Sequence, residues 1–115
     1  MPADLAAFFT RLAADPEAAA KGRQAGVVLQ FRLLEPSSFV VIDLTAEPFG
    51  VGTEEHGSPD VEITLSWATA DRILRGEISV GDAARTHAAQ ARGGFLKLLA
   101  LQGFLEVAKA RYGAR

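Results

Sequence analysis

The chain has 115 residues, no cysteine and a formal net charge of −2, with 49% apolar and 23% charged residues. This length suits a single domain, residues 1–115, that folds without a disulfide, and the absence of cysteine excludes thiol chemistry and cysteine-ligated zinc. Nucleic-acid binding needs an excess of Lys and Arg on one face, so the near-neutral charge argues against a DNA or RNA partner.

Two helices are predicted near the start of the chain. Apolar residues recur there at helical spacing, at Leu5, Phe8, Phe9 and Leu12. Asp4 stands before them and is expected to cap this first helix. Pro16 suits the first turn of a second, short helix, and Gly22 is expected to end it.

The pattern then changes to strands. Residues 27–34 alternate with period two and are rich in β-branched and aromatic side chains, which predicts a strand. Residues 39–44 predict a second strand in a hairpin with the first, and residues 51–55 predict a short third strand. The clearest alternation places Val61, Ile63, Leu65 and Trp67 on one face of a fourth strand.

Helices are predicted to dominate the rest of the chain. Thr69 is expected to cap a short helix that Gly76 stops, and Ser79 or Asp82 to cap another. Residues 88–92 fit either a helix or a strand, and residues 95–112 predict a long helix. The order of helix, strands and helices indicates an α+β fold.

The first half of the last helix has no polar face. At 100° per residue its apolar side chains point in nearly every direction, and only Lys97 and Gln102 interrupt them. Such a helix is either buried on all sides, between the sheet and the first helix, or meets a partner subunit, a ligand or a membrane surface. Both interpretations remain open from the pattern alone.

The sequence shows no catalytic or cofactor motif. The two histidines, His56 and His87, lack metal-binding spacing, and Glu54-Glu55-His56 is interpreted as a solvated turn. No serine has a nucleophile-elbow context, and Gly50-Val51-Gly52 lacks the third glycine of a dinucleotide-binding loop. We therefore expect no enzymatic activity, no metal and no cofactor.

No targeting or spanning segment is evident. The first residues lack a basic stretch followed by an apolar core, and the longest apolar region, residues 95–105, is shorter than the ~20 residues of a membrane span. We expect a cytoplasmic protein without stable membrane insertion.

The chain from Pro59 onward resembles the sterol carrier protein 2 family, and the order of a helix and two strands before it fits the same family, so the resemblance covers nearly the whole chain. Residues 60–66 resemble a strand of that family that ends in a small polar residue. Residues 69–77 resemble the following short helix with its Leu74-Arg75-Gly76 stop, and residues 94–101 resemble its final glycine and amphipathic helix. The region before that glycine, residues 86–92, departs from the family because small alanines replace the larger apolar residues of a fifth strand.

The resemblance implies a five-stranded, mostly antiparallel sheet covered on one face by helices. It also implies an apolar tunnel between the sheet and the last helix that holds a sterol, a fatty acyl chain or another hydrophobic lipid. The expected ligand-binding residues are Phe31, Val41, Phe49, Trp67, Phe95, Leu98, Leu99, Leu101, Gln102 and Leu105.

Two other functions remain open beside this lipid-binding hypothesis. The alternative is an interaction or accessory protein of the same fold that forms a homodimer or docks to a lipid or isoprenoid biosynthetic enzyme. A third is a factor that presents a lipid to a catalytic partner, for which the sequence offers no catalytic group.

Overall fold

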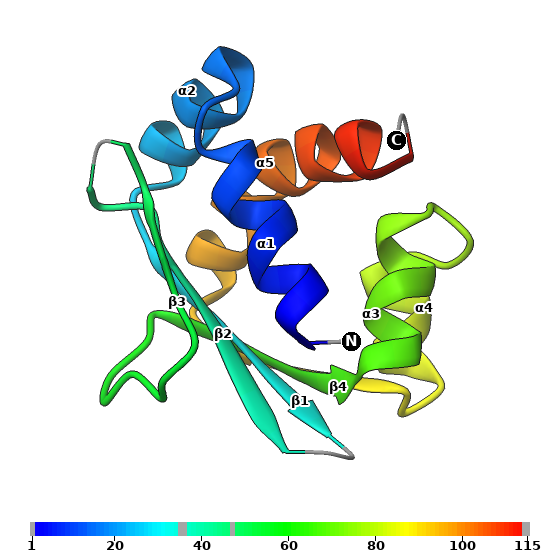
Figure 1. The fold of residues 1–115 in the computed structure, drawn as a ribbon. Helices are drawn as coiled ribbons and strands as arrows, with labels where there is room; N and C mark the ends of the chain where they lie inside the picture. Colours follow the sequence, from blue (N-terminus) through cyan, green and yellow to red (C-terminus); the bar gives the residue numbers. More distant parts are fainter. Residues whose placement is uncertain (1, 35–36, 47, 114–115) are drawn as a thin grey trace.

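The computed structural model describes residues 2–34, 37–46 and 48–113. In chain order its elements are α1 (Pro2–Leu12), α2 (Pro16–Ala25), β1 (Val28–Leu34), β2 (Ser38–Asp43), β3 (Gly50–Gly52), β4 (Val61–Ser66), α3 (Trp67–Leu74), α4 (Val80–Arg85), β5 (Ala89–Gly93) and α5 (Phe95–Gly113). Figure 1 shows one twisted sheet with the helices on one side of it and at one end.

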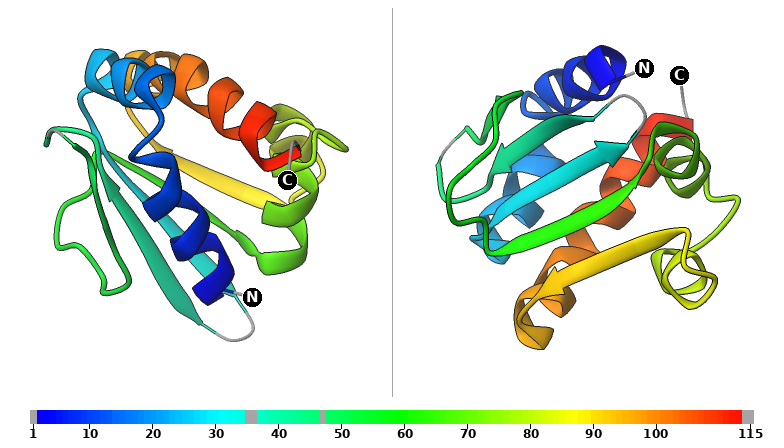
Figure 2. Two further views of the ribbon diagram at one scale, coloured as in Figure 1. Left: turned by 45° about the horizontal axis from the view of Figure 1, so that its top comes forward. Right: turned by 90° about the horizontal axis from the view of Figure 1, so that it is seen from below.

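The five strands form one sheet in the order β3-β2-β1-β4-β5. β1 and β4 are parallel, and the other three neighbouring pairs are antiparallel. The helices α1, α2 and α5 lie over one face of this sheet, while α3 and α4 lie at its end (Figure 2). The predicted α+β fold with a five-stranded, mostly antiparallel sheet is confirmed.

Period-two alternation divides the sheet into a helix-covered face and an outer face. Phe31 on β1 pairs with Val40 on β2 and Ile63 on β4, and this row is buried against the helices. The next row along the strands, which contains Gln30 and Val41, points to the outer face. Gln30 is buried there because residues 53–60 fold over it: it donates to Glu62 at 2.5 Å and accepts from the backbone of His56 at 2.7 Å.

The first two helices differ from the prediction at their ends. Asp4 lies within α1 and not before it, so it is not the cap. α2 continues past Gly22 to Ala25, and Gly26, which has a left-handed φ of 59°, caps its end. Gly22 instead serves close packing, because a Cβ there would lie 2.8 Å from the Leu44 side chain.

The middle elements also shift relative to the sequence prediction. Trp67 begins α3 and does not end β4, because Ser66, and not Thr69, caps the helix by accepting from the Thr69 backbone at 3.1 Å. Ser79 is the cap of α4, which settles the choice between it and Asp82. The ambiguous residues 88–92 fall largely within strand β5, and β3 is shorter than predicted. Among the described residues, no helix is both long and apolar enough to cross a membrane.

Candidate functional site

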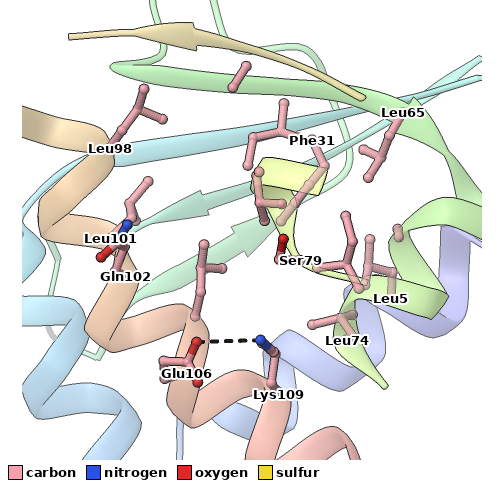
Figure 3. A pocket seen from close by; sticks show the side chains of 17 residues that line it. Leu5, Phe31, Leu65, Leu74, Ser79, Leu98, Leu101, Gln102, Glu106 and Lys109 are labelled. Carbon is pink, nitrogen blue, oxygen red and sulfur yellow. Dashed lines mark hydrogen bonds and ion pairs between the residues drawn. The ribbon is translucent and has the colours of Figure 1, made fainter. Parts of the chain in front are cut away.

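An apolar cavity of about 480 Å³ lies between the sheet and the helices α3, α4 and α5 (Figure 3). This volume is within the range of roughly 300–1,000 Å³ typical of small-molecule sites. The lining residues are Leu5, Phe31, Ile63, Leu65, Ala70, Ile73, Leu74, Ser79, Val80, Gly81, Ala91, Leu98, Leu101, Gln102, Leu105, Glu106 and Lys109.

The spacing of side chains along the strands and along α5 explains which of them line the cavity. On the sheet, Phe31, Ile63 and Ala91 stand side by side in the register of three neighbouring strands. Ala91 is small and exposed, so the β5 edge of this row leaves space where a larger side chain would fill it. On α5, the leucines at positions 98, 101 and 105 follow one another at intervals of three and four, which places them on one helix face.

The polar lining of the cavity comes from the helices. Ser79, Gln102, Glu106 and Lys109 supply it, and Figure 3 shows Glu106 and Lys109 together on α5. The Lys109 ammonium lies 3.4 Å from the Glu106 carboxylate. The Lys109 side chain is only 27% exposed whereas that of Glu106 is 72% exposed, so the cation is the more desolvated partner. The cavity can therefore hold an apolar body whose polar end meets Lys109.

A polar contact joins two of the cavity walls. The Tyr112 hydroxyl at the end of α5 donates to Asp71 of α3, which also pairs with Arg75 at 3.0 Å. The hydrogen bond from Tyr112 lowers the pKa of the Asp71 carboxyl, burial opposes this shift, and Arg75 adds to the lowering. The charged form of Asp71 therefore holds α3 and α5 together beside the cavity.

Five of the ten residues predicted to bind a ligand line this cavity: Phe31, Leu98, Leu101, Gln102 and Leu105. The strand and the helix that supply them are those expected from the sequence. Their contact with a ligand remains a prediction, which the proposal below takes up.

The other five predicted residues lie outside the cavity. Val41 points to the outer face of the sheet, because its neighbours Val40 and Ile42 are the ones that face the helices. Phe49 is buried in the core, edge-on to Phe104 at 5.5 Å between ring centroids.

The remaining three predicted ligand-binding residues lie near the starts of α3 and α5. Trp67, half-buried, packs against the core at the start of α3. Phe95 and Leu99 are 72% and 43% exposed at the start of α5. The apolar excess of α5 is thus divided: its later part is buried in the core, its middle lines the cavity, and its first turn faces outward.

Sequence reasoning missed two lining residues of β4 and the wall formed by α3 and α4. Ile63 and Leu65 could have been found, because the alternation of the fourth strand places them on the buried face with Val61. Ala70, Ile73 and Leu74 of α3 carry no such signal, since their apolar spacing fits any helix packed on a core.

A second, polar cavity of about 430 Å³ lies on the outer face of the sheet beside residues 55–60. Its groups are largely paired with one another: Gln30 with Glu62 and His56, and Asp60 with Lys97 at 2.7 Å. Within the described ranges, no three His, Asp or Glu side chains gather in a way that could hold a metal ion.

No protein-family model and no curated protein matches this sequence. Solved structures do match it in three dimensions. The apo form of sterol carrier protein 2 from Yarrowia lipolytica has a TM-score of 0.67 and 22% identity, over 83% of this chain and 81% of that chain. Palmitated SCP2L2 from Aedes aegypti has a TM-score of 0.53 and 23% identity, over 74% of each chain.

An enzyme also contains a similar fold. The stereoselective inverting sec-alkylsulfatase Pisa1 from Pseudomonas sp. has a TM-score of 0.64 and 16% identity, over 76% of this chain but only 14% of that chain. The likeness is confined to a small part of the sulfatase. Together these structures show that the chain has the sterol carrier protein 2 fold.

Proposed function

We propose that residues 1–115, with their sterol carrier protein 2 fold, form one lipid-binding domain that carries its ligand without chemical change. The observation that carries this proposal is the apolar cavity of about 480 Å³ between the sheet and α3, α4 and α5. A buried acyl chain gains about 0.8 kcal/mol for each CH2 removed from water, so an apolar cavity can bind one with few polar contacts.

The distribution of polar groups favours an amphipathic ligand. Phe31, Ile63 and Leu65 form an apolar wall on the sheet, while Gln102 and Lys109 stand on the helix opposite. We infer that the apolar part of the lipid lies against the sheet and that its polar end meets Lys109. An acyl chain with an acidic or hydrogen-bonding end fits this arrangement better than a wholly apolar molecule.

The similar structures support a carrier and not an enzyme. The Yarrowia lipolytica protein is matched over most of its length and is named as a sterol carrier, and the Aedes aegypti protein is described as palmitated. The sulfatase match involves a small part of that enzyme. We therefore propose binding or transfer of lipid as the function.

Displacement of a fluorescent fatty acid by palmitate tests this proposal, with two variants of one helix. Leu98→Trp places a large side chain in the cavity, whereas Leu99→Trp places it outside. We expect saturable binding to the natural sequence and a loss of about 5- to 150-fold in Leu98→Trp, because an overfilled site costs about 1–3 kcal/mol.

Leu99→Trp is the matched control and should bind palmitate as the natural sequence does. Thermal unfolding of both variants shows that they are folded. The proposal is wrong if the natural sequence binds no palmitate, or if both variants bind it as the natural sequence does.

A further inference from the structure

The helix-covered face of β5 carries only small residues. Ala91 pairs with Ile63 of β4 in the register of the sheet, and Gly93 pairs with Val61. Both β4 residues are buried against the helices, so their partners on β5 point to the same face. Ala89, the third β5 residue on this face, is equally small. The edge strand therefore adds almost no side-chain volume beneath the helices.

The helices cover only the beginning of this strand. Ala89, its first residue, is 4% exposed, and α4 contacts β5. Ala91 and Gly93, farther along the strand, are exposed. Ala91 nevertheless lines the apolar cavity. The cavity thus reaches solvent at Ala91, because neither a helix nor a large side chain closes it there.

The Leu98 end of the cavity lies beside this part of β5. Lys97, which precedes Leu98, pairs with Asp60 at 2.7 Å. The backbone oxygen of Asp60 is next to Gly93, where a Cβ would stand 2.6 Å from it. Leu98 itself lines the cavity and is only partly buried. The opening at Ala91 is therefore on the Leu98 side of the cavity.

Lys109 marks the opposite end of the cavity. Tyr112, one turn farther along α5, donates to Asp71, so this end of the helix lies against α3. Figure 3 shows Leu98 and Lys109 far apart along α5. The lining residues between them follow one face of the helix: Leu101, Gln102, Leu105 and Glu106. The steps from position 98 to position 109, at 1.5 Å for each residue, make this path about 16 Å long.

This length determines how much of an acyl chain the cavity can cover. An extended peptide residue has three backbone bonds and spans at most about 3.6 Å, so an extended chain advances about 1.2 Å for each bond. An acyl chain whose acidic end meets Lys109 reaches Leu98 after about 14 bonds. A longer chain fits only if its end can leave the cavity, and Ala91 stands at the place where the cavity is open.

We propose that Ala91 determines the chain length of the ligand, because its small side chain leaves the cavity open beside Leu98. The protein then accepts acyl chains of more than about 14 carbons, whose ends pass over Ala91 between β5 and α5. The proposal rests on the proposed lipid-binding function and deepens it. It assigns the ligand to the long-chain class and names the residue whose enlargement would impose an upper limit of length.

Isothermal titration calorimetry with dodecanoate and eicosanoate tests this role of Ala91. Dodecanoate ends before Leu98, whereas eicosanoate extends beyond it. We expect Ala91→Phe to bind dodecanoate as the natural sequence does and to lose about 5- to 150-fold in affinity for eicosanoate, the range for an overfilled site. Each variant is compared with the natural sequence for the same acid, which cancels the difference in solubility between the acids.

Gln90→Phe is the matched control. Gln90 is also exposed on β5, but it pairs with Thr64 and points to the outer face of the sheet. Its replacement should leave the affinity for both acids unchanged. Ala91→Val adds less volume and should weaken eicosanoate binding in the same sense but by less. Thermal unfolding shows which variants are folded, and Ala91→Val carries the test if Ala91→Phe is not.

The outcomes separate this proposal from the lipid-binding function itself. The role of Ala91 is overturned if the natural sequence binds dodecanoate but not eicosanoate, or if the folded Ala91 variants change the affinity for neither acid or for both equally. Binding of dodecanoate by the natural sequence supports the carrier function in each of these cases. Failure of the natural sequence to bind either acid overturns the carrier function and the role of Ala91 together.

Discussion

Tyr112 on α5 donates a hydrogen bond to Asp71 on α3, with 2.5 Å between the two oxygens. The tyrosine ring packs edge-on against Phe8 of α1 at 5.0 Å, so the residue is held on two sides. Both helices line the cavity, α3 through Ile73 and α5 through Leu105. This one contact therefore fixes how far apart two walls of the cavity stand.

Replacing Tyr112 with phenylalanine tests the contribution of this hydrogen bond. The variant keeps the ring against Phe8 but removes the hydroxyl that donates to Asp71, which leaves Arg75 as the partner of this carboxylate. We expect the free energy of unfolding to fall by about 1–3 kcal/mol, the range for a hydrogen bond to a charged group. Urea unfolding measures it, and an unchanged midpoint would show that the hydroxyl does not hold the two helices.

Stability should also fall in acid, because four carboxyl groups have lowered pKa values. A hydrogen bond from Lys97 lowers the pKa of Asp60, and bonds from Arg111, Tyr112 and Arg85 do so for Asp15, Asp71 and Asp82. A carboxyl whose pKa is lowered by folding stabilises the fold above its unfolded value and loses that effect as pH falls through the folded value.

The contribution of these carboxyl groups is therefore complete above about pH 4 and disappears below it. We expect the urea midpoint to fall steeply between about pH 4 and pH 2 and to change little between about pH 5 and pH 7. Asp60→Asn should make the acid fall shallower. A midpoint that rises on acidification would contradict these ion pairs.

Gly93 is required where β5 leads into α5. It has φ of 142°, and a Cβ there would lie 2.6 Å from the backbone oxygen of Asp60. We expect Gly93→Ala to cost at least about 2 kcal/mol, since a strained backbone alone costs about 1–3 kcal/mol.

The matched control is Gly76→Ala. Gly76 also has a positive φ, 79°, but a Cβ there would meet no atom within 4 Å. Its cost should be only about 1 kcal/mol, from backbone strain alone. Equal losses in the two alanine variants, measured by thermal unfolding, would show that close packing at Gly93 is unimportant.

Lys109 should favour ligands with an acidic end. Lys109→Met keeps most of the side-chain stem but removes the charge. We expect the affinity for palmitate to fall about tenfold, as for the loss of one contact with a charged group, and the affinity for palmityl alcohol to change little. Competition titrations measure both, and an equal loss for acid and alcohol would place the polar end elsewhere.

The sequence could predict the sheet and part of the cavity because both depend on local periodicity. The alternation of β1 and β4 and the leucine spacing of α5 identify the buried faces, and Phe31, Leu98, Leu101 and Leu105 all line the cavity. Register within the hairpin would have excluded Val41, since Phe31 pairs with Val40.

The remaining differences come from tertiary packing, which periodicity does not encode. A helical pattern identifies the residues that share a face of α5 but not the point where the sheet beneath it ends. Phe95 and Leu99 consequently lie on the surface and not in the cavity. The α3 wall depends on Ser66 ending β4 and turning the chain into the helix one turn earlier than Thr69 would.

The central claim is that a lipid occupies the cavity between the sheet and α5. Methyl NMR of the protein titrated with palmitate tests it most directly. We expect the methyl groups of Leu65, Leu101 and Leu105 to shift together and to saturate at one equivalent, while those of Leu12 and Leu44, buried outside the cavity, stay in place. Shifts confined to the exposed Leu96 and Leu99, with the cavity methyl groups unchanged, would contradict the claim.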